Sequence, residues 1–109
     1  MAERSMLKKK GSLPMCIVRP AMVGAASKEP FVGWTDTISA LGAPMFFGGI
    51  GIYKYQVGQG KEHIDLVAVD QCVNTILLTT CYCAHNPSKL HVFNHSSTFT
   101  NPLTQLQWN

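Results

Sequence analysis

The stretch that decides the fold reads LPMCIVRPAMVGAASKEPFVGW and runs from Leu13 to Trp34. It opens with an apolar run, PMCIV, that does not alternate with polar residues. Such a run is typical of a strand that is covered on both faces, as in a parallel α/β sheet. We therefore predict a strand over residues 14–19. Pro20 has no N–H group to donate to a neighbouring strand, so the strand is expected to finish there.

The segment after this strand is the first place to search for a functional site. Ligands of open α/β sheets bind at the carboxyl ends of strands, and we expect a loop over residues 21–34 at this position. Two large aromatic side chains, Phe31 and Trp34, lie near its end. Residues 42–51 are rich in glycine and apolar side chains. For them we expect irregular structure that serves either as core packing or as a pliable wall of a site.

A second strand and a helix are predicted further along the chain. Residues 64–69 form a short β-like run, and Asp70 directly after it is predicted to be a helix N-cap. An amphipathic helix is predicted over residues 71–84, because its apolar positions recur at helical spacing. These positions, expected to face the core, are Val73, Ile76, Leu77, Thr80 and Ala84.

The ends of the chain complete an α/β pattern. Residues 1–10 suit the end of a helix, and no capping residue precedes it, so the chain is expected to begin inside a larger domain. Residues 90–94 predict another buried strand, and Asn101 with Pro102 is expected to open a further helix. Helices and strands thus alternate along the sequence, which favours the α/β class.

Length and composition limit the function further. At 109 residues the chain is one domain or part of one. Its net charge of +3 is no nucleic-acid signature, and the lysines at 8–10 suit a solvated helix end. The four cysteines show no disulfide framework, so a reduced, intracellular protein is expected. The uncharged stretch 37–53 is interrupted by glycines and Pro44 and is shorter than the roughly 20 residues of a membrane span.

Motifs for metal or acid–base chemistry are not found. Cysteines and a histidine of the predicted helix, Cys72, Cys81, Cys83 and His85, match no zinc spacing. The cysteines are read as buried packing residues. Asp65 and Asp70 are read as an exposed acid and a helix cap, in preference to a catalytic pair. The glycines of residues 48–51 precede no clear helix and do not form a nucleotide-binding fingerprint.

Several segments together resemble fatty acyl-CoA reductases. The first is CIVRP at residues 16–20, and the second is KEPFVGWTD at 28–36, which is the more specific of the two. IDLVAVD at 64–70 is similar to that family's segment before a long helix. Val92-Phe93-Asn94 with Asn101-Pro102 resembles its last strand and the turn after it. These segments occur in the family's order and cover nearly the whole chain.

The resemblance implies a partial doubly wound, Rossmann-like sheet whose N-terminal half is missing. It implies an enzyme that uses NADPH to reduce a long-chain acyl-CoA to a primary alcohol. The family's catalytic tyrosine and lysine, in a Y-x-x-x-K motif, would precede Ala2, and its glycine fingerprint would lie further upstream. Neither is in this sequence, so the chain alone is expected to be inactive.

The resemblance also implies where ligands would bind. The backbone after the first strand would border the nicotinamide, through Pro20, Ala21, Met22 and Val23. Within a substrate-side insert over residues 21–63, the side chains that would form the acyl-chain wall are Trp34, Phe46 and Phe47. The parent family is expected at the peroxisomal or endoplasmic reticulum membrane, held there by a C-terminal domain.

Two alternatives stay open. The first is another extended short-chain dehydrogenase or epimerase, because an arginine–proline strand end is common in that superfamily. The second is a non-catalytic, truncated isoform that docks on a full-length reductase through an exposed sheet edge.

Overall fold

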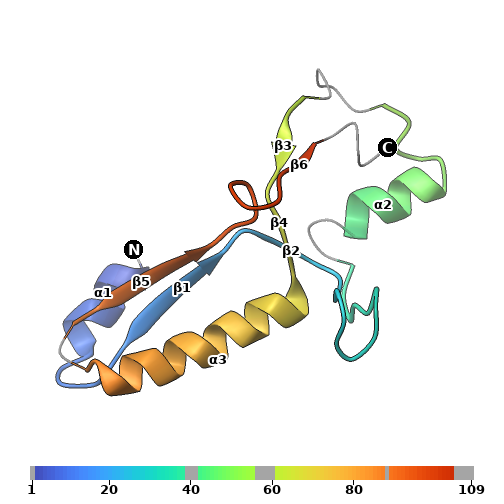
Figure 1. The fold of residues 1–109 in the computed structure, drawn as a ribbon. Coiled ribbons are helices and arrows are strands. Elements are labelled where there is room, and N and C mark those ends of the chain that lie inside the picture. The colour runs from blue at the N-terminus through green and yellow to red at the C-terminus, as the bar shows by residue number, and fades with distance from the viewer. Residues whose placement is uncertain (1, 39–41, 56–60, 88, 105–109) are drawn as a thin grey trace.

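The computed structural model describes residues 2–38, 42–55, 61–87 and 89–104. These residues form the mixed α/β arrangement that the sequence predicts (Figure 1). In chain order the elements are α1 (Ala2–Lys9), β1 (Cys16–Pro20), β2 (Met22–Gly24), α2 (Gly42–Gly49), β3 (His63–Ile64), β4 (Leu66–Ala68), α3 (Val69–His85), β5 (His91–His95) and β6 (Leu103–Thr104).

The strands associate in three pairs. β1 runs parallel to β5, with Cys16 opposite His91 and Pro20 opposite His95. β2 runs parallel to β4, and β3 is antiparallel to β6. The strands predicted over residues 14–19 and 90–94 correspond to β1 and β5, which begin and end one or two residues later. Helix α3 lies along the β1–β5 pair and leads from β4 to β5, which is the crossover that parallel strands require.

The loop that we expected over residues 21–34 does not begin directly after Pro20, because residues 22–24 form strand β2. The Ala21 N–H donates to the His95 carbonyl at 2.9 Å, and the Met22 N–H donates to the Asp65 carbonyl at 3.1 Å. The chain thus passes from β5 as its partner to β4 and continues as β2. Proline removes a single donor, and β4 supplies new acceptors one residue later.

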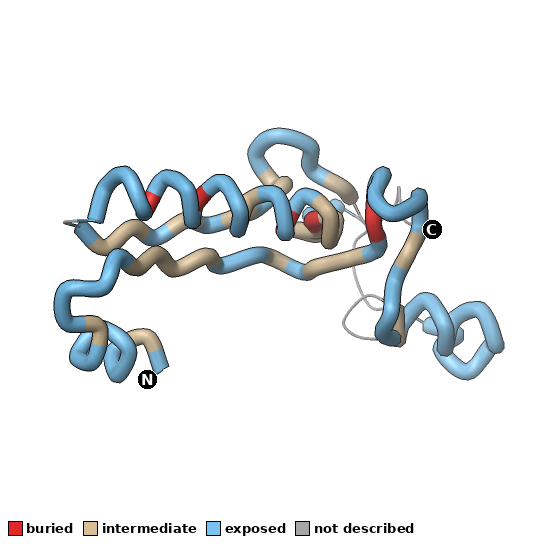
Figure 2. The backbone as a smooth tube through the Cα atoms, turned by 90° about the horizontal axis from the view of Figure 1, so that it is seen from below, coloured by how far each residue is buried: buried red, intermediate tan, exposed pale blue. Residues whose placement is uncertain are grey.

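Helix α3 buries a different face from the predicted one. The apolar residues Val73, Ile76 and Leu77 are 46–60% exposed. The buried residues are Cys72, Thr79 and Cys83, which recur at spacings of seven and four. In Figure 2 the buried, red segments of this helix lie on its side toward the strands. α3 is apolar on both faces, so periodicity could not select between them, and the smaller side chains are the ones turned toward the strands.

Two further expectations about secondary structure are wrong. Residues 42–49 are a helix, α2, with Pro44 in the first turn, where its missing N–H costs no hydrogen bond. Gly51, at φ 76°, lets the chain turn back so that the N–H groups of residues 52 and 53 donate to the Phe47 carbonyl. Asn101 and Pro102 lead into strand β6 and do not open a helix.

The molecule is elongated (Figures 1 and 2). Its radius of gyration is 17.3 Å, whereas a compact domain of this length would have about 13 Å. Among the described residues only Ala26, Val67, Cys72, Thr79 and Cys83 are buried. The core is therefore a thin layer between α3 and the strands.

Thiol labelling is expected to report this layer. Cys81 is exposed, whereas Cys72 and Cys83 are 7% and 4% exposed. Burial also raises the pKa of the Cys83 thiol, which reduces its reactive thiolate. Under native conditions a thiol reagent should therefore modify Cys81 first and leave Cys72 and Cys83 unmodified until the chain unfolds, as read by peptide mass spectrometry. Equal labelling of Cys81 and Cys83 in the native chain would contradict the packing of α3.

Candidate functional site

A carboxylate fixes the loop that follows β2. Asp70 lies in the first turn of α3, where Ala68 and not Asp70 is the N-cap, so the capping prediction is wrong. The Asp70 carboxylate accepts hydrogen bonds from the N–H and hydroxyl of Ser27, each at 3.0 Å. It also accepts the N–H groups of Lys28 at 2.9 Å and Glu29 at 3.3 Å. These hydrogen bonds hold the pKa of the Asp70 carboxyl well below its usual value, and the bond from the Ser27 N–H has the largest effect.

The clamped loop ends at Trp34. The Ala26 N–H donates to the Trp34 carbonyl and the Gly33 N–H donates to the Ala26 carbonyl, both at 2.9 Å. Gly33 has a φ of 84°, a conformation that favours glycine and closes this turn. Ala26 is 4% exposed and anchors the loop beside the strands. The Asp70 clamp and this turn together set the position of Trp34.

An apolar cleft of about 500 Å³ opens beside Trp34 at the carboxyl ends of β2 and β4. Its walls come from β2, β4, the turn around Trp34 and the first turns of α2; the residues that line it include Val23, Gly24, Trp34, Met45, Leu66 and Val69. Its size is that of typical small-molecule sites, roughly 300–1,000 Å³. It lies where ligands of α/β sheets bind.

A smaller cleft of about 330 Å³ also includes Trp34 among its lining residues. It is bounded by Glu29, Pro30 and the start of α3, including Asp70 and Val73. The indole therefore borders two clefts. Removal of the indole would enlarge the space available beside both.

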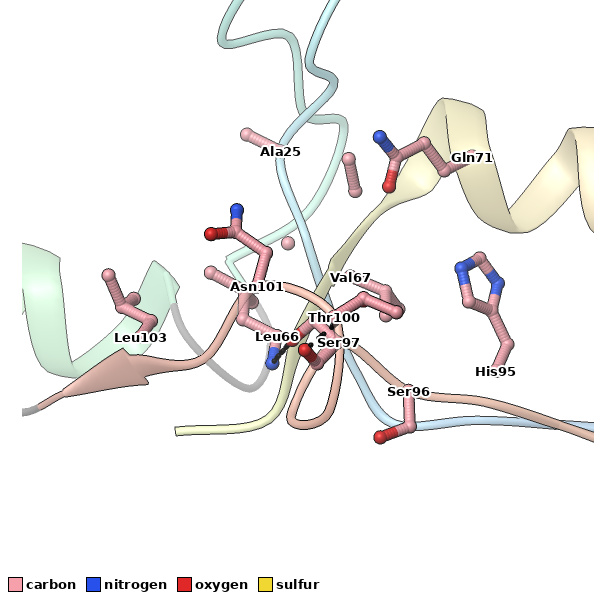
Figure 3. Close-up of a pocket in the computed structure, with 12 residues that line it drawn as sticks. Ala25, Leu66, Val67, Gln71, His95, Ser96, Ser97, Thr100, Asn101 and Leu103 are labelled. Carbon is pink, nitrogen blue, oxygen red and sulfur yellow. Dashed lines mark hydrogen bonds between the residues drawn. The ribbon is translucent and has the colours of Figure 1, made fainter. Parts of the chain in front are cut away.

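A third cleft, of about 450 Å³, is more polar (Figure 3). It is lined by the end of β5, the segment after it and the start of α3. The polar side chains that line it are Gln71, His95, Ser96, Ser97, Thr100 and Asn101. Leu66, Val67 and Leu103 supply its apolar part.

Asp65 fixes one wall of this polar cleft. Its carboxylate accepts the Ser97 N–H at 2.8 Å and the Ser97 hydroxyl at 3.2 Å. The Leu66 N–H in turn donates to Ser97 Oγ at 3.3 Å. The backbone bond from Ser97, with further bonds from Ser96 and Ser97 hydroxyls, lowers the pKa of Asp65. Asp65 thus ties the segment after β5 to the start of β4, whereas Asp70 ties the loop after β2 to the first turn of α3.

The predicted cofactor residues lie along the β1–β2 junction. Pro20 and Met22 are exposed, while Ala21 and Val23 are half-buried. The N–H groups of Ala21 and Met22 are both used in strand pairing, so they are not free donors for a ligand. Only Val23 of the four lines the apolar cleft.

The predicted acyl-wall residues divide in a similar way. Trp34 lines the apolar cleft. Phe46 and Phe47 are 49% and 44% exposed on α2, with their rings edge to face at 5.6 Å. α2 reaches the cleft through Gly42 and Met45 instead.

Sequence reasoning missed the polar cleft and the two carboxylate ties. Asp70 and Ser27 are 43 residues apart, and no local pattern joins them. In the part of the chain that the structure describes, no three His, Cys, Asp or Glu side chains come together as metal ligands. No described helix is long and apolar enough to cross a membrane.

Parallel strand pairs, a crossover helix and clefts at the carboxyl ends of strands define part of a nucleotide-binding α/β domain. Comparison with known proteins gives the family. Residues 1–76 match the family model of an NAD-binding domain described as "Male sterility protein". The chain belongs to this family, and the relatives that it matches are fatty acyl-CoA reductases.

Several relatives named as fatty acyl-CoA reductases match most of the chain. The chain is 36% identical over 103 residues to fatty acyl-CoA reductase 1 of Rattus norvegicus, which is 94% of this chain and 20% of the relative. Identity to the human protein of the same name is 35% over the same length. Putative fatty acyl-CoA reductase 7 of Arabidopsis thaliana is 26% identical over 96 residues, 88% of this chain and 24% of that protein. The chain spans about a fifth of the length of the reductase 1 relatives it matches.

Proposed function

We propose that this chain is the carboxyl-terminal part of the NAD(P)-binding domain of an alcohol-forming fatty acyl-CoA reductase. The parent enzyme would use NADPH to reduce a long-chain acyl-CoA to a primary alcohol. The observation that carries the proposal is the apolar cleft beside Trp34, at the carboxyl ends of β2 and β4, in a chain of this family.

The acyl chain would lie in the apolar cleft. Val23, Met45, Leu66 and Val69 give it an aliphatic lining, and Trp34 adds a large flat side chain. Burial of apolar surface is the main source of affinity for a hydrocarbon chain, about 0.8 kcal/mol for each CH₂ group. Phe46 and Phe47 lie next to Met45 on α2 but are exposed and do not line the cleft, so the proposed acyl wall does not include them.

The cofactor would meet this chain along a short edge. Val23 is the residue best placed to border a nicotinamide, because it is half-buried and lines the cleft where the acyl group would end. The glycines at 48–51 lie at the end of α2 and not between a strand and a helix, so they do not form a pyrophosphate cradle. Residues of this chain would therefore border the nicotinamide of the cofactor and not its pyrophosphate. NADPH, when bound, would supply the hydride.

The isolated chain is expected to show no reductase turnover. Its sequence has no Y-x-x-x-K motif to donate a proton to the developing alkoxide, and no glycine fingerprint to hold the pyrophosphate. With NADPH and palmitoyl-CoA we therefore expect oxidation of NADPH and formation of hexadecanol at the level of a protein-free control. Turnover above that control by the purified chain would contradict the assignment of the missing parts.

The cellular location follows the family in this proposal. We propose that the parent enzyme acts at the peroxisomal or endoplasmic reticulum membrane, where its long-chain substrate would partition. Localisation of a tagged parent protein by microscopy would test this, and a purely cytosolic signal would count against it.

A further inference from the structure

The polar cleft and the apolar cleft adjoin each other. Both are lined by Gly24 and Ala25, at the end of β2 and just after it, and by Leu66, the first residue of β4. A single ligand that crosses Gly24 and Ala25 would place one end in each. The pair of clefts therefore suits an amphipathic molecule with an apolar tail and a polar, elongated arm.

The lining of the polar cleft indicates the chemistry of that arm. Its lining includes the side-chain amides of Gln71 and Asn101 and the hydroxyl of Thr100, which donates to the Ser97 carbonyl and can still accept a hydrogen bond (Figure 3). No lysine or arginine is among the described residues that line it, so its side chains offer no cation that would pair with a phosphate. Amides and hydroxyls both donate and accept hydrogen bonds, and they match a neutral ligand that carries amides of its own.

His95 adds a further polar group. Its Nδ1 is buried without a hydrogen-bond partner among the described residues. A proton on Nδ1 would be an unpaired buried donor, which is costly, so the tautomer with the proton on Nε2 is favoured. Because His95 lines the cleft, this tautomer offers an Nε2–H donor that suits a ligand carbonyl.

We propose that the polar cleft binds the amide-bearing pantetheine arm of an acyl thioester whose acyl chain occupies the apolar cleft. The inference rests on the proposed function for the identity of the thioester, and it adds a second subsite. The arm has two amide groups and no charge, which matches the neutral lining. The thioester carbonyl would then lie near Gly24 and Ala25, between the two clefts.

The test uses the full chain and three probes. Dodecanoyl-pantetheine would fill both clefts, methyl dodecanoate would fill only the apolar one, and pantetheine only the polar one. Binding is measured by isothermal titration calorimetry. We expect dodecanoyl-pantetheine to bind at least about tenfold more tightly than methyl dodecanoate, since one or two added hydrogen bonds supply that difference.

Two asparagines provide a matched pair of variants. Asn101 lines the polar cleft, whereas Asn94 is an exposed residue of β5 that does not line it. Asn101→Leu should weaken dodecanoyl-pantetheine binding about tenfold and leave methyl dodecanoate unchanged. Asn94→Leu should change neither affinity. His95→Phe, which keeps a planar aromatic ring but removes its nitrogens, should act as Asn101→Leu does. Circular dichroism checks that each variant folds.

The outcomes separate this inference from the proposed function. If methyl dodecanoate binds but dodecanoyl-pantetheine binds no more tightly, the pantetheine subsite is wrong and the acyl cleft stands. If methyl dodecanoate does not bind, the acyl cleft itself is wrong. If nicotinamide mononucleotide competes with dodecanoyl-pantetheine, and Asn101→Leu abolishes that competition, the polar cleft is reassigned to the cofactor. Dodecanoyl-CoA and dodecanoylated acyl carrier protein, compared directly, distinguish the two sources of the arm, and the proposed function predicts the CoA thioester.

Discussion

Replacement of Asp70 by asparagine is expected to release the loop over residues 26–34 while helix α3 stays formed. The carboxylate accepts four hydrogen bonds from residues 27–29, and an asparagine side chain has one acceptor oxygen and a donor NH₂ group in their place. Amide exchange at Ser27, Lys28 and Glu29 should therefore become at least about tenfold faster. Hydrogen exchange followed by mass spectrometry measures this loop and α3 in one experiment.

Asp65→Asn is the matched control for this variant. Asp65 ties the segment at Ser97 to β4 in the same way but does not touch the loop that ends at Trp34. Its replacement should speed exchange near Ser97 and leave residues 27–29 unchanged. If Asp70→Asn leaves those amides protected, the clamp is not what holds the loop.

The same clamp predicts a dependence on pH. The pKa of Asp70 is lowered from its ordinary value of 3.8 by the bonds from Ser27, Lys28 and Glu29. Because the folded value lies below the unfolded one, the stabilisation is complete above pH 3.8 and is lost as the pH falls toward the folded value. With Trp108→Phe as background, Trp34 emission should stay constant from pH 7 to pH 4 and change only below. In Asp65→Asn this transition should persist.

Replacement of Trp34 by alanine is expected to have the largest effect on substrate use. Trp34 lines the apolar cleft and is half-buried. Loss of a partly buried indole from a hydrocarbon site removes about 1.5–2.5 kcal/mol of binding. In a reductase that contains this chain, Trp34→Ala should lower kcat/KM for palmitoyl-CoA tenfold or more, by about that energy. Trp34→Phe should recover most of the loss.

Phe46→Ala is the comparison that tests the cleft itself. Phe46 is a large aromatic residue of the same segment, but it is exposed and does not line the cleft. Its replacement should change kcat/KM by less than about threefold, because an exposed ring loses little buried area. An equal loss for Phe46→Ala and Trp34→Ala would show that the acyl chain lies along the outer side of α2.

The class of fold could be predicted from the sequence because its signals are local. The apolar run PMCIV predicts a parallel strand that ends at Pro20. β1 is parallel to β5 and finishes at that residue, although none of its residues is buried. The order of helix and strand patterns gives the α/β class. The resemblance of KEPFVGW also led to Trp34, which the structure places at the apolar cleft.

The Asp70 clamp, the packed face of α3 and the polar cleft could not be predicted, because they depend on contacts between residues far apart in the sequence. Asp70 has the position and chemistry of a helix cap, and only the tertiary structure turns its carboxylate toward Ser27. Helix α3 is apolar on nearly every side, which is typical of a helix buried in a larger domain, so its packed face could not be read from spacing. The polar cleft joins residues of β2, β4 and the segment after β5, and no stretch of sequence contains all three.

The most direct measurement is alcohol formation by a chimeric reductase. The segment of Rattus norvegicus fatty acyl-CoA reductase 1 that matches this chain, 103 residues long, is replaced by the corresponding residues of this chain. With NADPH and palmitoyl-CoA, the chimera is predicted to form hexadecanol, and Trp34→Ala is predicted to reduce that rate. A chimera that folds and binds NADPH but forms no alcohol would contradict the assignment of this chain to the substrate side of a fatty acyl-CoA reductase.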